Sequence, residues 1–482
     1  MNAITVQAPA SKSLSHRMLM AAALAEGESE VAHILESDDI ARTRELLELL
    51  GAVFTPAGTG AYRVRGIAGR VAGSGPEASP LSCFVGESGT TCRLISAILA
   101  AGMGRFRLHG AGRMHDRPMR DLIAALQQLG AYFHYEEKEG YLPLVLTASG
   151  FDTSQLPAGM LDMGADESSQ YLSGLLLAAP LSPSGLTIRL AGKKAVSWPY
   201  IGLTLDTLER FGIRFSVEEL LPDELRDSMA DKAAEISPVC SSAGGGSLKA
   251  GSWQKTDWRT LQEAVPGELR FCVEQGMYKA GMHTVEGDWS GASYLLAAGA
   301  IGPAPVCVEG LSPSSLQGDA AILSILESMG AHISWQGKRV TVSPARLHGI
   351  SVDMGQCPDL VPTVAAVAAH AAGPTYISNV AHLRIKESDR LAAPAVELAK
   401  VGCQVEVLDS GLRITPPESG PRRPAQGDIF HAHGDHRIAM GMSLLGLPGC
   451  AGGAGFAVEL DDPACVAKSF PTFWDVWKKV SP

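Results

Sequence analysis

Cationic side chains recur beside serine, threonine and glycine at distant points of the chain. The segments are Ser11–Arg17, Gly86–Arg93, His115–Pro118, His382–Arg390, Gly434–Arg437 and Ala467–Pro471. Hydroxyl and carboxylate side chains often cap helix N-termini, where free backbone N–H groups attract anions. Neighbouring lysines and arginines would strengthen that attraction. We therefore interpret the set as a binding site for small anions, with ordinary capping of each helix as the alternative.

Two of the arginines, Arg17 and Arg437, lie in segments that are otherwise apolar. Because a guanidinium buried without a partner is costly, each must face a carboxylate or a bound anion. Salt bridges inside the fold would satisfy either arginine. Six cationic segments together nevertheless favour one anion-binding cleft over six independent pairs.

Two carboxylates accompany these cations. Asp359 follows a Cys-Pro pair, and Glu387 lies between Lys386 and Ser388. Nearby positive charge keeps a carboxylate ionised, as a proton acceptor requires. Both are candidate acid–base groups, although balancing of the arginine charge would explain them equally well.

A metal site is a further alternative, because His431 and His433 are two residues apart and could reach one ion from a strand face. No cysteine cluster or glutamate in the sequence supports it, and a polar loop before a helix is the simpler explanation. The chain also lacks Walker and Rossmann glycine motifs. We therefore expect acid–base chemistry on anionic substrates, without a metal or another cofactor.

The elements that must position these residues follow one repeated order: an apolar helix, a more charged helix that ends on glycine, and a strand. We expect the apolar helices at Leu14–Ala25, Thr91–Ala101, Ser169–Ala179, Gly291–Ile301, Val361–Ala372 and Arg437–Leu447. Residues of the types that cap helix N-termini lead these segments, and we expect the caps to be Ser13 or Ser15, Thr90 or Thr91, Ser168 or Ser169, Ser290, Asp359 and Asp435. The charged helices should end at Gly51, Gly130, Gly212, Gly330 and Gly402, with a sixth at Phe473–Val480. Glycine ends helices well because it tolerates the left-handed conformation. The recurrence predicts an α/β fold of repeated units.

Helices that are apolar on all sides must be buried, and a unit of about 75 residues cannot surround one alone. The units must therefore share cores, which suggests two groups of three. The interval between Gly212 and Gly330 is about 40 residues longer than the others. We place an insertion at about 217–278, either a surface excursion or a lid over a cleft.

Composition limits the partners. The net charge is −11 without an extended basic stretch, which argues against a nucleic-acid partner. Nine cysteines are scattered without a Cys-x-x-Cys pair, and residues 1–17 lack the apolar stretch of a signal peptide. No apolar stretch is long enough for a membrane span. We expect a cytoplasmic protein with small-molecule substrates and no membrane partner.

Seven motifs, in order along the chain, resemble those of the 5-enolpyruvylshikimate-3-phosphate (EPSP) synthase family of enolpyruvyl transferases. They are Ser11–Arg17, Gly86–Arg93, Ser168–Gln170, Ser197–Tyr200, Lys386–Arg390, Asp435–Arg437 and Lys468–Pro471. The resemblance runs from Ser11 to about Phe470 and leaves out only the insertion.

The resemblance implies a two-domain inverse α/β barrel with six βαβαββ repeats in two pseudo-threefold domains, joined by two hinge crossings. Residues 13–285, including the insertion, would form the first domain, and residues 1–12 with 286–482 the second. It also implies the reaction, in which the 5-hydroxyl of shikimate 3-phosphate attacks phosphoenolpyruvate and phosphate leaves a tetrahedral intermediate. We expect a monomer that closes its domains on both substrates.

Matched motif by motif, the resemblance implies roles for single residues. Shikimate 3-phosphate would contact Lys12, Ser13, Arg17, Ser168, Ser169, Ser197, Asp359 and Lys386. Phosphoenolpyruvate would contact Lys12, Gly89, Arg117, Gln170, Arg390, Arg437 and Lys468. Asp359 would accept the hydroxyl proton, and Glu387, assisted by Lys12, would exchange the proton at the methylene carbon.

Two positions depart from the pattern. Many members of the family carry asparagine where this chain has Glu87, near the phosphoenolpyruvate loop, and others carry asparagine where it has His382, near shikimate 3-phosphate. Both departures leave details of substrate contact and inhibitor sensitivity open.

Two other functions compete with this one. The sister enolpyruvyl transferases that act on UDP-N-acetylglucosamine rely on a cysteine in a mobile loop near the position of Arg117, and Arg113–Arg117 contains none. A non-catalytic anion-binding protein is the second, and the retained Lys12, Asp359 and Glu387 argue against it.

Overall fold

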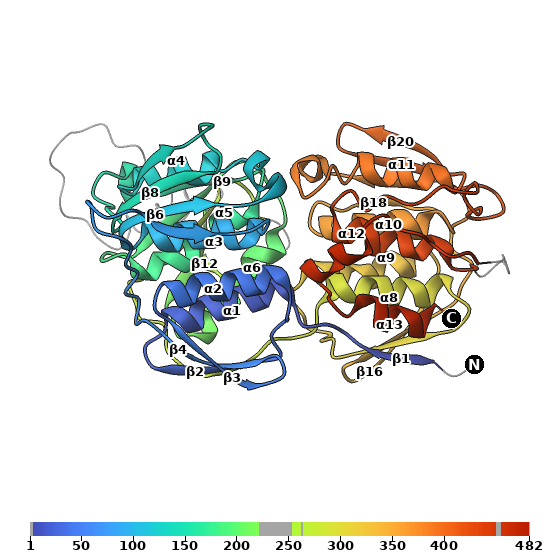
Figure 1. Cartoon of the computed structure of the whole chain (residues 1–482), viewed down its shortest axis with the longest axis horizontal. Helices are drawn as coiled ribbons and strands as arrows, with labels where there is room; N and C mark the ends of the chain where they lie inside the picture. Colours follow the sequence, from blue (N-terminus) through green and yellow to red (C-terminus); the bar gives the residue numbers. More distant parts are fainter. Residues whose placement is uncertain (1–2, 221–252, 262–263, 450–454, 482) are drawn as a thin grey trace, which may run out of the picture.

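The chain forms two lobes of similar build, seen side by side in Figure 1. The computed structural model describes residues 3–220, 253–261, 264–449 and 455–481. Each lobe has its own hydrophobic core. The first core draws its residues from Ala10 to Val285, and the second from Val6, Ala8 and the segment Trp289 to Val480. The chain therefore passes between the lobes twice, once on either side of the first core.

Six apolar helices occupy the centres of the lobes, as predicted. They are α1 (Lys12–Leu24), α3 (Gly89–Ala100), α5 (Ser169–Ala178), α8 (Trp289–Ile301), α10 (Val361–Ala368) and α12 (His436–Ser443). The last two are shorter than expected, because the chain leaves α-helical geometry after Ala368 and tightens into a 3-10 turn at Leu444–Gly446. Across the described ranges, no helix combines the length and apolar character needed to cross a bilayer.

A second set of helices lies outside the first. They are α2 (Asp38–Leu49), α4 (Arg120–Gln128), α6 (Trp198–Arg210), α9 (Ile322–Ser328), α11 (Ala392–Lys400) and α13 (Phe473–Val480). The five predicted closing glycines all have positive φ, from 72° at Gly212 to 106° at Gly330. A side chain would be strained in this conformation, so glycine fixes where each helix ends.

Five sheets share one strand order, in which the first pair is parallel and the next two pairs are antiparallel. The first lobe contains three of these sheets. The strands of the first sheet are, in order, β14 (Met282–Thr284), β2 (Glu28–Ala32), β4 (Ala61–Arg65) and β3 (Val53–Gly58), and those of the second are β5 (Leu81–Phe84), β6 (Met103–His109), β8 (Leu144–Ser149) and β7 (Tyr132–Tyr135). The strands of the third sheet are β9 (Leu161–Ala165), β10 (Leu186–Ala195), β13 (Leu269–Val273), β11 (Phe215–Leu220) and β12 (Trp253–Thr256). In the second lobe they are β1 (Ile4–Gln7), β15 (Val306–Glu309), β17 (Arg339–Ser343), β16 (His332–Gln336); and β18 (Ser351–Asp353), β19 (Thr375–Ser378), β21 (Gly411–Thr415), β20 (Gln404–Leu408). Helices and strands alternate, which confirms the α/β class.

The last unit, around α12 and α13, differs from the others. The only β pairing in its described residues is an isolated bridge between Phe430 and Leu460. Strands that are distant in sequence pair in both lobes: β1 pairs with β15 in the second lobe, and β14 pairs with β2 in the first.

The ends of the segment assigned to an insertion are part of the third sheet. β11 pairs directly with β13, and Tyr278 is buried in the first core. Between these strands the chain adds β12 at the sheet edge and a buried Trp258. Residues 221–252 lie outside the described residues. They include most of an acidic run at 218–235 and a glycine- and serine-rich stretch at 241–247.

The predicted helix caps are right at two helices. Ser168 and Asp435 accept hydrogen bonds from Gln170 N and Arg437 N. The other predicted caps are wrong. Ser88 and Asp288 cap α3 and α8, so that Thr90, Thr91 and Ser290 lie inside these helices, while Ser13 and Ser15 lie inside α1 and Asp359 in a 3-10 turn before α10. The helices begin before their apolar stretches do, because small polar residues also adopt the helical backbone.

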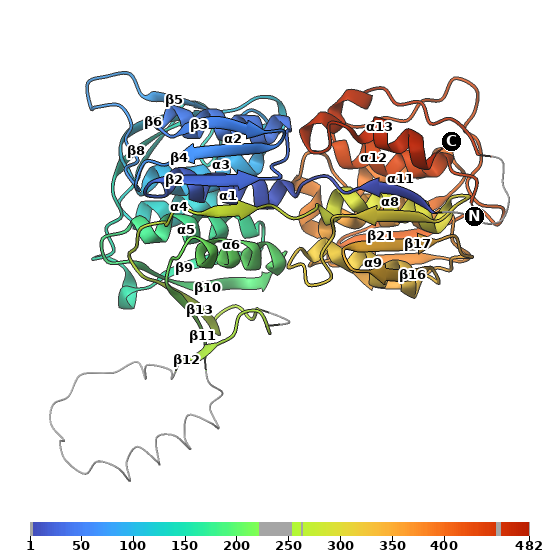
Figure 2. The ribbon, with the colours of Figure 1, turned by 90° about the horizontal axis from the view of Figure 1, so that it is seen from below.

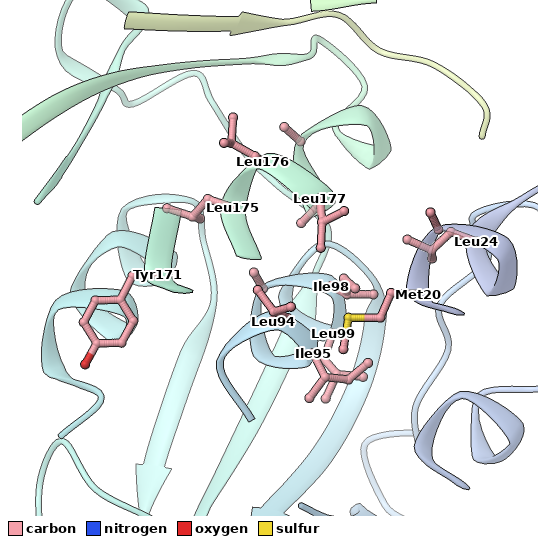
Figure 3. Close-up of a cluster of buried hydrophobic side chains, with 14 of the residues drawn as sticks. Met20, Leu24, Leu94, Ile95, Ile98, Leu99, Tyr171, Leu175, Leu176 and Leu177 are labelled. Atoms are coloured by element: carbon pink, nitrogen blue, oxygen red, sulfur yellow. The ribbon is translucent and has the colours of Figure 1, made fainter. Parts of the chain in front are cut away.

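The packing of α3 against α1 and α5 predicts a local stability contrast (Figure 3). Leu99 is completely buried in this layer, whereas Leu49 at the end of α2 is 44% exposed. Leu99→Ala should lower the free energy of unfolding by about 3 kcal/mol, because it removes buried methyl groups and leaves a cavity. Leu49→Ala should lower it by less than about 1 kcal/mol. Chemical denaturation of both variants measures the difference, and equal losses would contradict this core assignment.

Candidate functional site

A polar pocket lies where the two lobes meet. It is lined by Lys12, Ser13, Arg17, Thr90, Arg117, Glu167, Ser168, Ser169, Gln170, Val196, Ser197, Tyr200, Pro358, Asp359, His382, Lys386, Glu387, Arg390, His436 and Arg437. Of the candidate site residues, only Gly89 and Lys468 are missing from this lining. Gly89 and Lys468 nevertheless lie close by, against Arg117 and Glu87 respectively.

Helix N-termini direct many of these side chains into the pocket. In the first lobe α1 supplies Lys12 and Arg17, and α5 supplies Ser169. In the second lobe a 3-10 turn before α10 carries Asp359, and α12 opens with Arg437 near its start. Helix N-termini favour negative ligands, so the backbone contributes to the positive potential of the pocket.

Arg390 is the central ion-pairing residue of the second lobe. Its guanidinium is only 2% exposed and lies 2.7 Å from Asp359 Oδ1, 2.9 Å from Glu387 Oε2 and 2.7 Å from Asp435 Oδ2. Asp435 is itself fixed by hydrogen bonds from Ser388 Oγ and Arg437 N. Three carboxylates therefore compensate one buried arginine and hold it in a single orientation.

Asp359 is held between two arginines. Arg437 Nη2 lies 2.8 Å from its Oδ2, which also accepts a hydrogen bond from Tyr200 Oη at 2.9 Å. Burial alone would raise the pKa of Asp359, but Arg437, Arg390 and Lys386 outweigh it and keep that pKa well below its usual range. The carboxylate is therefore ionised and can accept a proton.

Glu387 lies between Arg117 of the first lobe and Arg390 of the second. Its carboxylate is 3.4 Å from Arg117 Nη1 and 2.9 Å from Arg390 Nη2. Burial opposes ionisation, yet Arg117, Arg390 and Lys468 keep the pKa of Glu387 well below its usual value. Glu387 is therefore ionised and joins the two lobes across the pocket.

Arg17 is buried without a carboxylate partner among the described residues. Its guanidinium donates to Thr204 Oγ1 (2.8 Å), to Ser173 Oγ (3.2 Å) and to the carbonyl oxygens of Ser13 and Tyr200. All of these acceptors are neutral, and burial lowers the pKa of Arg17 to about 10. A buried positive charge without a counter-ion is unfavourable, so a bound anion would stabilise it.

Lys12 and Lys386 add further positive charge to the lining of the pocket. Lys12 forms an ion pair with Asp39, and its backbone N–H donates to Asp288 Oδ2 at 3.0 Å. Lys386 has a pKa lowered to about 8 by burial, which Asp359 and Glu387 partly offset. Positive charge thus approaches the pocket from both lobes.

Gly89 leaves room for Arg117. A Cβ atom built on Gly89 would lie 2.7 Å from the Arg117 guanidinium, which is too close for any side chain. The absence of a side chain at residue 89 therefore allows Arg117 its position beside Glu387.

The two unusual positions differ in their surroundings. Glu87 lies at the rim, half exposed, with its carboxylate 3.5 Å from Lys468 Nζ of the other lobe. His382 is buried in the pocket wall, and neither of its ring nitrogens has a hydrogen-bond partner in the described part of the chain. Burial lowers the pKa of His382 to about 3, so the ring is neutral.

Sequence reasoning gave no substrate or catalytic role to the polar lining residues Thr90, Glu167, Tyr200 and His436, nor to the apolar lining residues Val196 and Pro358. Signals existed for three of the polar residues. Tyr200 lies one helical turn after Ser197, Glu167 directly precedes Ser168, and His436 separates Asp435 from Arg437. Such adjacency shows proximity but not which side chain points inward, which depends on the start of each helix.

The histidines considered as metal ligands have other partners. His431 Nδ1 lies 2.9 Å from Asp461 Oδ2, and His433 Nε2 lies 2.9 Å from the buried Glu397 Oε1. Within the described ranges, no group of three or more histidine, cysteine or acidic residues could hold a metal ion.

The loop that precedes α4 contacts the second lobe. Gly112–Asp116 forms a 3-10 turn, and Arg113 Nη1 donates to the backbone oxygen of Glu387 at 3.0 Å. The turn contains no cysteine.

The EPSP synthase (3-phosphoshikimate 1-carboxyvinyltransferase) family model matches residues 3–221 and 263–477. A 3-phosphoshikimate 1-carboxyvinyltransferase from Nitrosomonas europaea is 36% identical over 99% of this chain and 96% of its own length. One from Syntrophobacter fumaroxidans is 37% identical over 98% and 96%. The matched ranges omit 222–262, the additional segment between β11 and β13.

Solved structures share the fold. An EPSP synthase from Acinetobacter baumannii superposes with a TM-score of 0.70 at 21% identity, covering 99% of this chain and 95% of the other. The enolpyruvyl transferase NikO from Streptomyces tendae gives 0.66 at 16% identity, covering 100% and 94%.

The different environments of Arg390 and Arg17 predict losses of stability of very different size when their charge is removed. Arg390→Gln should lower the free energy of unfolding by about 3 to 5 kcal/mol, because it leaves the buried Asp435 without its cationic partner and removes one of the two arginines that hold Asp359 and Glu387. Arg17→Gln should cost far less, because its partners are neutral. Urea unfolding of both ligand-free variants at pH 7 provides the measurement, and a loss at Arg17 as large as at Arg390 would contradict this account.

Proposed function

The chain belongs to the EPSP synthase family, and from this premise we propose that it transfers the enolpyruvyl group of phosphoenolpyruvate to the 5-hydroxyl of shikimate 3-phosphate, releasing phosphate. This step belongs to the shikimate pathway of aromatic amino acid biosynthesis. One observation carries the proposal: a single pocket gathers cations of both lobes around the ionised Asp359 and Glu387. Both substrates are multiply anionic, so bringing them together requires such neutralisation.

Shikimate 3-phosphate would occupy the part of the pocket around α1, α5 and the start of α6. Its proposed contacts are Lys12, Ser13, Arg17, Ser168, Ser169, Ser197, Asp359 and Lys386. Arg17 supports this assignment, since its buried charge has only neutral partners and lies among several hydroxyl groups. Phosphate oxygens accept well from both kinds of donor.

Phosphoenolpyruvate would bind next to it, between the lobes. Its proposed contacts are Lys12, Gly89, Arg117, Gln170, Arg390, Arg437 and Lys468. Arg117 and Arg390 already share Glu387 in the ligand-free site. A bound carboxylate or phosphate would compete for these guanidinium groups and weaken their hold on Glu387.

The chemistry follows from that competition. The substrate oxygen bonds to C2 of phosphoenolpyruvate while its proton passes to Asp359 and C3 gains a proton. Glu387 with Lys12 would then take a proton back from C3, so that the C2–C3 double bond re-forms as the bond from C2 to the phosphate oxygen breaks, and the proton held by Asp359 would pass to the leaving phosphate. In the ligand-free site the low pKa values make both carboxylates weak bases. Two bound anions add negative charge, which raises the pKa values of the carboxylates and strengthens them as bases.

We further propose that the lobes are two domains, residues 13–285 and residues 1–12 with 286–482, and that they close on the substrates. The shared strand order of five sheets supports six βαβαββ repeats in an inverse α/β barrel. Contacts of Arg117 and Arg113 with Glu387 support closure, because they already bridge the cleft. We propose a monomer that acts in the cytoplasm, consistent with the free thiols of the seven described cysteines.

Phosphate release tests the function directly. Purified protein should release inorganic phosphate from phosphoenolpyruvate only when shikimate 3-phosphate is present. Release with UDP-N-acetylglucosamine instead would assign the chain to the sister reaction. No release with either acceptor would leave a binding protein without catalytic activity.

Asp359→Asn should lower kcat about a thousandfold, because the amide cannot accept the hydroxyl proton. The Michaelis constants should change less, since the amide keeps the size and the contact with Tyr200. Steady-state kinetics at pH 7 measures both parameters. A kcat within tenfold of the wild type would remove Asp359 from its assigned role.

The lowered pKa of Lys386 predicts that substrate affinity depends on pH. Its pKa is about 8, so its charge is present at pH 7 and mostly lost at pH 9. The Michaelis constant for shikimate 3-phosphate should therefore rise about tenfold over this range, while the phosphate, with a second pKa near 6, keeps its charge. Lys386→Arg should abolish the rise because the guanidinium stays charged. An equal rise in this variant would assign the effect to another group.

A further inference from the structure

The two segments that connect the lobes run side by side in opposite directions (Figure 2). Residues 9–11 form one segment and residues 286–288 the other. Ser11 N donates to Glu286 O at 2.9 Å, and Asp288 N donates to Pro9 O at 2.7 Å. The backbone alone therefore makes the crossings a short two-stranded connection.

Gln317 lies on neither crossing, yet its side-chain amide bonds to both. Its Oε1 accepts from Ser11 Oγ at 3.1 Å and from Trp289 N at 3.2 Å. Its Nε2 donates to Glu286 Oε1 and to Gly287 O, both at 2.8 Å. The residue is buried, and all four hydrogen-bonding positions of the amide are occupied.

These bonds end beside Lys12. The backbone N–H of Lys12 donates to Asp288 Oδ2, and the other oxygen of Asp288 caps α8 at Gly291 N. The turn after Gln317 reaches the opposite lobe as well, since a Cβ atom on Gly318 would lie 2.8 Å from Pro199 Cγ. One turn therefore contacts both crossings and the start of α6 at the pocket wall.

We infer that Gln317 is a positioning residue: it holds the two crossings together, so that the lobes move on one hinge and Lys12 keeps its place at the pocket. The inference rests on the proposed function only for the part that Lys12 plays in turnover. The hinge network itself does not depend on the identity of the substrates.

The chemistry of the amide makes the inference testable by pH. A glutamate at this position would lose the donors and face Glu286, so two carboxylates would repel each other. Protonation at acidic pH would remove the repulsion and restore one donor. The other charged groups nearby are Lys12, Asp288 and Asp319, and they are shared with the wild type, which provides the reference profile.

The experiment compares Gln317→Ala, Gln317→Glu and the exposed control Gln336→Ala in the phosphate-release assay from pH 5.5 to 8. Gln317→Ala should lose at least about tenfold in kcat at every pH, because small displacements of catalytic groups are costly. Gln317→Glu should be equally impaired at pH 8 and recover several-fold relative to wild type at pH 5.5. Gln336→Ala should match the wild type.

Hydrogen exchange gives a readout that needs no activity. The N–H groups of Ser11 and Lys12 should exchange at least about tenfold faster in Gln317→Ala than in the wild type, and those of the α3 core should not change. If Gln317→Ala does not fold, Ser11→Ala, which removes one of the four bonds, should show a smaller increase at the same positions.

The inference would be overturned if Ser11 and Lys12 of Gln317→Ala exchanged at the wild-type rate and the kcat of this variant stayed within twofold of the wild-type value. A Gln317→Glu profile parallel to that of Gln317→Ala would overturn it too. If the wild type releases no phosphate, the proposed function fails, and the exchange data still decide the hinge role of Gln317.

Discussion

The structure depends on keeping many positive side chains close together before any substrate is bound. Like charges in a partly buried space repel strongly, and each must also give up its hydration. The chain solves this with interleaved carboxylates: three surround Arg390, one of them also holds Arg437, and another bridges to Arg117. The cations are thus fixed in place by partners that a bound anion can partly replace. Preorganised charge of this kind costs no rearrangement at the moment of reaction.

Arg17 differs from the other arginines that line the pocket and makes the charge balance of the two sides of the pocket unequal. It is as deeply buried as Arg390, but its acceptors are hydroxyl and carbonyl oxygens. The first lobe therefore offers an uncompensated charge, whereas the second offers charges that are already paired. This asymmetry fits two anionic ligands that are bound differently, one mainly by the first lobe and the other by both lobes together.

The two-lobe architecture supplies what single helices cannot. Arg17 and Arg117 lie in the lobe built on the first core, and Arg390 and Asp359 lie in the other lobe, so the complete site exists only at their boundary. The two chain crossings that form the hinge lie beside Lys12, at this boundary. The rim contact of Glu87 with Lys468 and the neutral His382 are local features of this chain within the same arrangement. Neither removes a carboxylate or a cation from the central cluster.

The sequence by itself determined the repeat of buried and outer helices, because apolar periodicity and helix-ending glycines are local properties. It also indicated which residues carry charge into apolar helices. It misjudged the starts of several helices, assigning caps to Ser13 and Ser290 where Ser11 and Asp288 take the cap positions, since small polar residues fit both positions. It did not identify Tyr200, Glu167 or Gln317, whose contacts depend on segments far away along the chain.

Only the tertiary structure decided which charges pair. From the sequence, Arg17 and Arg437 were equivalent, each needing a carboxylate or an anion. The fold gives Arg437 the carboxylate of Asp359 and leaves Arg17 with neutral partners. Local sequence fixes the type of each side chain, whereas its counter-ion depends on how two separate lobes meet.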